Sequence, residues 1–325
     1  ATPARSSTAC SPTSGLGWLF PAPASSCTTV PRCSPWTPTT PTIWPPTSGW
    51  PIKGPSAKEV SKYIKKYQNE KIVIKCGGKV LLDPMLLDSM IEDIAILKKL
   101  GLTPLLIHGG GLGIKKKLDE LNIKSKFIMG LRVTDEKMIK IVENVMVEFN
   151  KKIIRLIEKK SCKAKPITIK ENNVIHVEQE SEELGYVGKP TKVNTNLLID
   201  IIQKDFIPVV TPMGLDQKGQ VFNINADTAA GAIARSLRSR RLLLVTDVEG
   251  VLDKNEKLIP EIRSHEAEKL INDQTIHGGM IPKIRTCIDA ANNGVRGVVI
   301  IDGRRPHSIL FELFSDQGAG TLIRR

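Results

Sequence analysis

The stretch Ile72-Val-Ile-Lys-Cys-Gly-Gly78 decides the expected fold, because a run of β-branched residues ends there in a lysine and two glycines. Comparable apolar runs recur at residues 105–107, 207–210, 242–245 and 298–301, and segments with helical periodicity separate them. Apolar strands that alternate with helices are typical of a mostly parallel sheet covered on both faces. We therefore predict an α/β fold, a three-layer αβα sandwich around a mostly parallel central sheet.

The bulk composition excludes few classes of function. The chain has 325 residues, of which 41% are hydrophobic and 25% charged, and its formal net charge is +13. A basic balance can indicate nucleic-acid binding. The lysines are spread over helix-like segments without interleaved aromatic residues, so we expect no nucleic-acid partner. No apolar run approaches the ~18–20 residues that span a membrane, so no membrane partner is expected either.

The six cysteines have no metal-site spacing such as C-x-x-C. We therefore expect reduced thiols, no protein-built metal site and a cytoplasmic location.

Residues 1–50 differ in composition from the rest of the chain. They contain no Lys, Asp or Glu, hold all four tryptophans and are rich in Ser, Thr and Pro. We expect residues 1–54 to be a disordered or non-native leader. The alternative is a transit peptide, which would place the protein in a plastid or another organelle. Residues 55–325 are expected to form one domain, with an N-terminal lobe over 55–205 and a C-terminal lobe over 206–325.

Glycines and a lysine follow the first two expected strands, at the sheet edge where parallel sheets bind ligands. Lys75 would carry its charge there, and the glycines at 77 and 78 could bring backbone N–H groups close to an anion. The glycine triplet at 109–111 precedes a helix, whose N-terminus favours phosphate or carboxylate. The alternative is a solvated lysine beside tight turns. His108 is expected to be a packed, hydrogen-bonded histidine.

A polar turn at residues 223–227, Asn-Ile-Asn-Ala-Asp, precedes another expected helix. Asp227 could face the same edge of the sheet or could only cap the helix. Arg132 could clamp a carboxylate with two hydrogen bonds or could lie on the surface. Thr134 is expected to cap the helix that follows. Lys283, in Gly278-Gly-Met-Ile-Pro-Lys, could be functional or merely exposed.

Together and in this order, these motifs resemble those of the amino acid kinase family. The resemblance runs from about residue 58 to residue 325. It rests on six segments, namely 74–78, 108–111, 130–135, 223–231, 246–250 and 278–283. The closest pattern is that of members which phosphorylate the γ-carboxylate of N-acetylglutamate in arginine synthesis. The resemblance therefore implies N-acetylglutamate and ATP as substrates, with Mg²⁺ bound mainly through the nucleotide phosphates.

The resemblance also implies roles for single residues. Lys75 and Lys283 would stabilise the phosphoryl group in transfer, and Asp227 would orient both lysines. Arg132 would bind the α-carboxylate of the acyl amino acid. Further contacts to the substrate are implied for Gly109, Gly110, Gly111, Asn223 and Asn225. Contacts to the nucleotide are implied for Gly77, Gly78, Thr246, Asp247, Gly250, Gly279, Met280 and Ile281.

Two end segments resemble those of arginine-inhibited members of the family. Residues 58–67 look like the N-terminal helix that joins dimers into a hexamer, so we expect a homodimer or a trimer of dimers. Residues 306–321 look like an inhibitor site, and arginine is the implied inhibitor. The residues implied there are Tyr63, His307, Glu312, Gly318 and Gly320.

The chain departs from the family pattern at several positions. Cys76 stands where an aromatic residue is usual, Met129 where asparagine is usual, and Leu112-Gly113 where Pro-Gln is usual. The glycine-rich loop expected around residues 167–174 is absent from the sequence. Two alternatives therefore stay open: a related kinase acting on a 2-aminoadipate derivative of lysine synthesis, and a non-catalytic protein that senses arginine or nucleotide.

Overall fold

An eight-stranded sheet forms the centre of the computed structural model, which describes residues 54–325. The strand order is β12 (Glu261–Arg263), β14 (Gly320–Arg324), β13 (Val298–Asp302), β11 (Arg241–Thr246), β1 (Lys71–Cys76), β2 (Thr103–His108), β8 (Ile207–Val210) and β5 (Ala164–Ile167). Neighbouring strands run parallel except β13 and β14, which are antiparallel. The predicted mostly parallel sheet is confirmed. The predicted leader lies outside the described residues, except for Gly54.

Two smaller sheets contribute to the described part of the chain. One has the order β10 (Val221–Asn223), β9 (Met213–Leu215), β6 (Ile175–Gln179) and β7 (Gly188–Val193). The other is the hairpin of β3 (Phe127–Ile128) and β4 (Leu131–Arg132). Strands β8 and β9 follow residue 205, yet they pair with strands that precede it. The division into lobes at residues 205 and 206 stays a prediction.

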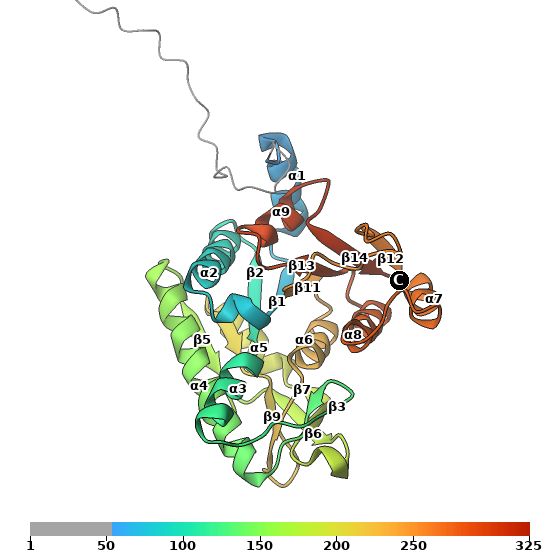
Figure 1. Ribbon diagram of the computed structural model, residues 1–325. Helices are drawn as coiled ribbons and strands as arrows, with labels where there is room; N and C mark the ends of the chain where they lie inside the picture. Colours follow the sequence, from blue (N-terminus) through green and yellow to red (C-terminus); the bar gives the residue numbers. More distant parts are fainter. Residues whose placement is uncertain (1–53) are drawn as a thin grey trace, which may run out of the picture. The chain divides into compact units, whose positions relative to one another are not determined.

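Helices cover both faces of the central sheet (Figure 1). Helices α6 and α8 pack on one face, whereas α2 and α9 pack on the other. The helices are α1 (Ala57–Tyr67), α2 (Pro84–Lys99), α3 (Gly111–Glu120), α4 (Glu136–Lys159), α5 (Thr195–Gln203), α6 (Ala226–Ser236), α7 (Ser264–Asn272), α8 (Met280–Asn292) and α9 (Ser308–Phe314). None of the helices within residues 54–325 combines the length and apolar character that a membrane crossing requires.

The pleat of β1 sends neighbouring side chains to opposite faces of the sheet. Val73 belongs to the apolar cluster that includes α6 and α8. Side chains two residues apart share a face, so Lys75 leaves the sheet on this same side, at the carboxyl end of the strand. Cys76 points to the other side and is fully buried. The adjacent strands end at the same edge, where Thr246 is in register with Asp302.

Aspartates cap two of the helices. Asp83 caps α2, because its Oδ1 accepts hydrogen bonds from the backbone N–H groups of residues 85 and 86. The predicted cap of α4 is wrong by one residue, since Asp135 Oδ1 accepts from Met138 N at 2.8 Å. Thr134 instead donates its hydroxyl to the Arg132 carbonyl. The backbone of Thr134 forms an isolated parallel β-bridge with Gly185, so Thr134 stays extended.

Candidate active site

Three residues that are remote in sequence meet at the carboxyl edge of the central sheet. The Lys75 ammonium of β1 lies 3.0 Å from Asp227 Oδ1. The Lys283 ammonium, in the first turns of α8, donates to Asp227 Oδ2 at 2.6 Å. All three side chains are largely buried, with exposed fractions between 11% and 14%. The structure therefore brings together the three residues that the sequence singled out as catalytic.

The charges at this site do not cancel. Burial would raise the pKa of Asp227, but attraction by Lys75 and Lys283 and the hydrogen bonds outweigh it and lower the pKa to about 2. The carboxylate is therefore ionised at neutral pH and holds the two ammonium groups close together. One carboxylate between two cations leaves a positive charge in a largely buried place. Such a charge favours binding of a further anion.

Asp227 is free for this role because another residue caps its helix. Asn225 Oδ1 accepts hydrogen bonds from Asp227 N at 2.9 Å and from Thr228 N at 3.2 Å. The alternative interpretation, in which Asp227 is only a helix cap, is therefore wrong. Asn223 ends β10, two residues before this cap. Substrate contacts of Asn223 and of the Asn225 amide stay predictions.

Gly77 and Gly78 are glycines for different reasons. Gly77 has φ −153°, an extended conformation that any residue adopts. A Cβ at this position, however, would lie 2.5 Å from Lys75 Nζ, so the missing side chain leaves room for the ammonium. Gly78 has φ +64°, the left-handed region that favours glycine. Its Cβ position is 3.7 Å from the carboxyl carbon of Asp247, which places that acid beside the turn.

The second glycine turn packs directly against the first. Gly109 N donates to Cys76 O at 2.7 Å, and a Cβ on Gly109 would lie 3.5 Å from Gly77 Cα. Gly110 is the N-cap of α3 and offers no side chain to its first N–H groups. Those N–H groups lack intrahelical partners, as at every helix start. The predicted anion-binding helix terminus thus lies next to the Lys75 turn.

His108 contacts this second glycine turn from the protein interior. Its ring is fully buried, and burial lowers its pKa to about 4, so the imidazole is neutral. Asn150 Nδ2 on α4 donates to Val209 O at 2.8 Å and contacts His108 Nε2 at 3.3 Å. Because an amide nitrogen can only donate, Nε2 accepts and Nδ1 donates to Gly109 O at 3.1 Å. The predicted packed histidine is confirmed, and Asn150 was missed by the sequence analysis.

Arg132 is a buried residue with an exposed fraction of 8%, so the alternative of a surface arginine is wrong. One terminal nitrogen donates to Gly111 O at 3.1 Å, and the other donates to Ser125 Oγ. The guanidinium therefore reaches the second glycine turn. Its position suits the predicted carboxylate clamp at that turn.

The residues predicted for the nucleotide differ in their surroundings. Thr246 Oγ1 donates to Asp247 Oδ1 at 3.3 Å, and Gly279 caps α8 with nothing within 4 Å of its Cβ position in the described part of the chain. Gly250 packs against β14, because a Cβ there would lie 2.5 Å from Thr321 Oγ1. Met280 and Ile281 pack against the apolar core. Their nucleotide contacts stay predictions.

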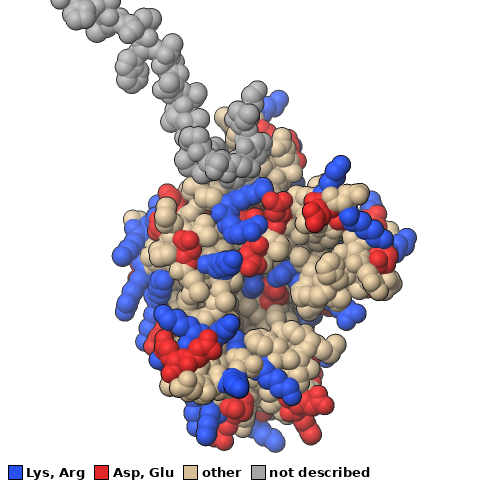
Figure 2. Space-filling model, in the orientation of Figure 1, with Lys and Arg blue, Asp and Glu red and all other residues tan. Residues whose placement is uncertain are grey.

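The surface of the visible face carries both signs of charge. Lys and Arg side chains lie among Asp and Glu side chains over the whole face shown in Figure 2. The predicted absence of a nucleic-acid partner is not tested by this distribution and stays a prediction.

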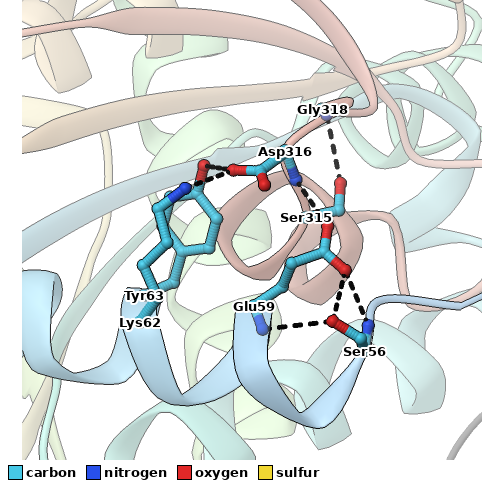
Figure 3. Close-up of polar contacts among 7 residues, drawn as sticks. All are labelled: Ser56, Glu59, Lys62, Tyr63, Ser315, Asp316 and Gly318. Carbon is cyan, nitrogen blue, oxygen red and sulfur yellow. Dashed lines mark hydrogen bonds and ion pairs between the residues drawn. The ribbon is translucent and has the colours of Figure 1, made fainter.

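Helix α1 docks on the loop that follows α9 (Figure 3). Tyr63 donates its hydroxyl to Asp316 Oδ1 at 2.6 Å, and Lys62 donates to the same oxygen at 2.7 Å. Asp316 N donates to Glu59 Oε1 at 3.3 Å. Burial, followed by the bond to Asp316, raises the pKa of Tyr63 to about 12, so its hydroxyl stays a donor.

Two further residues of the predicted inhibitor site, Glu312 and Gly318, meet at the same loop. Burial raises the pKa of Glu312 to about 6, and its Oε2 accepts from Ala319 N at 2.7 Å. A Cβ on Gly318 would lie 3.0 Å from that oxygen. His307 Nδ1 instead pairs with Asp93 Oδ1 of α2 at 2.7 Å. Gly320 lies in β14, where close pairing with Ile300 O leaves no space for a side chain.

Comparisons with known proteins agree with this geometry. The acetylglutamate kinase of Pelagibacter ubique is 58% identical over 274 residues, which cover 84% of this chain and 95% of that protein. The acetylglutamate kinase of Methylobacterium nodulans is 46% identical over 277 residues, covering 81% of this chain and 91% of that protein.

Several solved structures are similar in fold. Among them is the N-acetylglutamate synthase of Neisseria gonorrhoeae in complex with coenzyme A and N-acetyl-glutamate, with a TM-score of 0.75 and 24% identity. The match covers 82% of this chain and 62% of that one, so this chain spans less than two thirds of the synthase. The amino acid kinase family model matches residues 70–302, from β1 to the end of β13. The matched residues include Lys75, Asp227 and Lys283. Because the match spans most of its length, the chain belongs to the amino acid kinase family.

Proposed function

We propose that this protein transfers the γ-phosphoryl group of ATP to the γ-carboxylate of N-acetylglutamate, the second step of arginine biosynthesis. The product is N-acetylglutamyl 5-phosphate. The similarity to two acetylglutamate kinases over most of the chain supports this substrate. The observation that carries the proposal is the convergence of Lys75 and Lys283 on the buried carboxylate of Asp227.

The chemistry of the reaction fits this arrangement. A carboxylate is already a nucleophile at neutral pH, so no general base is needed. The barrier arises because two anionic groups must approach each other, and fixed positive charge with good positioning lowers it. Lys75 and Lys283 supply that charge, and Asp227 keeps both ammonium groups in place. We propose Mg²⁺, bound mainly through the nucleotide phosphates, as the accompanying cation, which would neutralise part of the phosphate charge.

The surrounding residues have proposed roles as well. Arg132 would bind the α-carboxylate of the substrate, aided by the two asparagines at 223 and 225. Backbone N–H groups of the two glycine turns would donate to phosphate oxygens and to the reacting carboxylate. The nucleotide would lie beside Thr246, Asp247 and the start of α8.

Regulation and assembly belong to the same proposal. We propose that arginine inhibits the enzyme at the place where α1 meets the loop after α9. The support is that Tyr63, Glu312 and Gly318 gather there, and that a carboxylate such as Glu312 suits a guanidinium. We also propose a cytoplasmic homodimer, or a hexamer in which α1 joins dimers.

An ADP-release assay tests the proposed function. Purified protein should release ADP when N-acetylglutamate, ATP and Mg²⁺ are all present, and should respond less to the N-acetyl derivative of 2-aminoadipate. Lys75→Ala and Lys283→Ala should each lower kcat by roughly a hundredfold or more. Arginine at millimolar concentration should reduce the rate. Near-normal turnover by either lysine variant would refute the roles proposed for the lysines.

A further inference from the structure

The hairpin of β3 and β4 displays an aromatic ring that core packing does not explain. Phe127 is 55% exposed, although burying a side chain of its size would be favourable. It lies directly opposite Arg132 in the antiparallel register of the hairpin. The guanidinium carbon of Arg132 is 4.7 Å from the centroid of the Phe127 ring. This is the distance of a cation–π contact, and cross-strand neighbours are suited to it.

Arg132 is held by groups that leave its charge available. Its recorded partners in residues 54–325 are the Ser125 hydroxyl, the Gly111 carbonyl and the Phe127 ring, and none of these is a carboxylate. Burial lowers the pKa of Arg132, and the field of Asp119 only partly opposes this. Two hydrogen bonds use a minority of the five N–H donors of a guanidinium. The remaining donors can serve a bound anion.

The hairpin is short, and its turn holds a methionine in the left-handed region. Each strand has two residues, and the turn consists of Met129 and Gly130, with φ +49° and +82°. Two positive φ angles characterise the type I′ turn, in which asparagine rather than methionine favours the first position. Short hairpins are only marginally stable by themselves. The orientation of Arg132 therefore depends on the side chains that contact it.

We propose that Phe127 and Ser125 are positioning residues that fix the plane of the Arg132 guanidinium for the carboxylate of the substrate. The ring sets the face of the guanidinium, and the hydroxyl sets its direction toward the Gly111 carbonyl. This inference rests on the proposed function of Arg132. The contacts of Phe127 and Ser125 explain how a hairpin with a strained turn can hold the buried Arg132 guanidinium in a fixed orientation.

Steady-state kinetics of a matched pair of variants tests the proposal. Phe127→Leu removes the ring but keeps apolar bulk, and Phe127→Tyr keeps the ring. The leucine variant should raise KM for N-acetylglutamate roughly two- to fivefold, the range expected for an exposed cation–π contact. KM for ATP should stay unchanged, because the residues proposed for the nucleotide lie at the end of β11 and the start of α8, and not in this hairpin. The tyrosine variant should restore the KM of the wild type.

Two further variants sharpen the test. Ser125→Ala should raise KM for N-acetylglutamate in the same manner. Leu121→Ala, which shortens another exposed apolar side chain outside the hairpin, should leave all constants unchanged. An unchanged KM in Phe127→Leu would overturn the proposal, as would a tyrosine variant as impaired as the leucine one. A wild type inert toward N-acetylglutamate would overturn the proposed function together with this inference, whereas an active wild type isolates the inference.

Discussion

Replacing Gly77 with alanine should disable the enzyme through a single added methyl group. The backbone of Gly77 is extended, so alanine costs no conformational strain there. The new Cβ would lie 2.5 Å from Lys75 Nζ, whereas ordinary contact begins at 3.4 Å. The ammonium must therefore retreat by about 0.9 Å from a place where it touches Asp227 at 3.0 Å.

A displacement of this size has a large kinetic effect. Misplacement by about 1 Å can cost on the order of a hundredfold in rate, which corresponds to about 2.7 kcal/mol of transition-state stabilisation. We therefore expect kcat of Gly77→Ala to fall by roughly two orders of magnitude. The thermal unfolding midpoint should stay within about 2 °C of the wild type, because the lysine tip alone has to move.

A double-mutant cycle separates this explanation from a general disturbance of the turn. If the methyl group acts through Lys75, then Gly77→Ala should cost little further activity in a Lys75→Ala background. The measurement is kcat for ADP release in all four proteins under saturating substrates. Additive losses would refute the reasoning, and so would a Gly77→Ala enzyme with normal kcat.

Three other predictions concern the charges and the backbone. Asp227→Asn should lower kcat by roughly a hundredfold or more. It should also reduce the free energy of unfolding by about 3 kcal/mol, since two largely buried cations lose their counterion; unchanged urea unfolding would contradict this. Met129→Asn should raise the stability by roughly 0.5–1 kcal/mol at a left-handed turn position and keep activity, as thermal unfolding and the ADP assay can establish. The pKa of Asp93 is raised to about 6 by burial, and that of His307 is raised by its bond to Asp93, so both groups bind protons more tightly in the folded state. The stabilising contribution of Asp93 is therefore largely present at pH 4 and lost as the pH rises through 6, whereas that of His307 is lost only above pH 6.5. Asp93→Asn should weaken this loss in unfolding curves recorded from pH 4 to 8.

The sequence was sufficient for the central sheet and for the position of Lys75, because apolar strands and their glycine ends mark the carboxyl edge. Residue patterns alone could not establish that Lys75 and Lys283 share Asp227, since those segments are far apart and meet only in the folded chain; only the family resemblance implied it. Asn150 escaped notice because one polar residue on an apolar helix face is a weak signal. The turn at Met129 lacked the asparagine that normally marks such hairpins, so the opposition of Phe127 and Arg132 could not be foreseen.

The departure at Cys76 has a practical consequence for reagents that attack sulfur. The thiol adjoins Lys75 in the chain, yet the pleat turns it to the opposite side of the sheet, fully enclosed. Burial raises its pKa to about 12, so the reactive thiolate is almost absent at neutral pH. Alkylating agents and mild oxidants therefore do not react with Cys76 while the protein stays folded. Labelling of Cys76 can instead serve as a sensitive marker of the moment at which the central sheet opens.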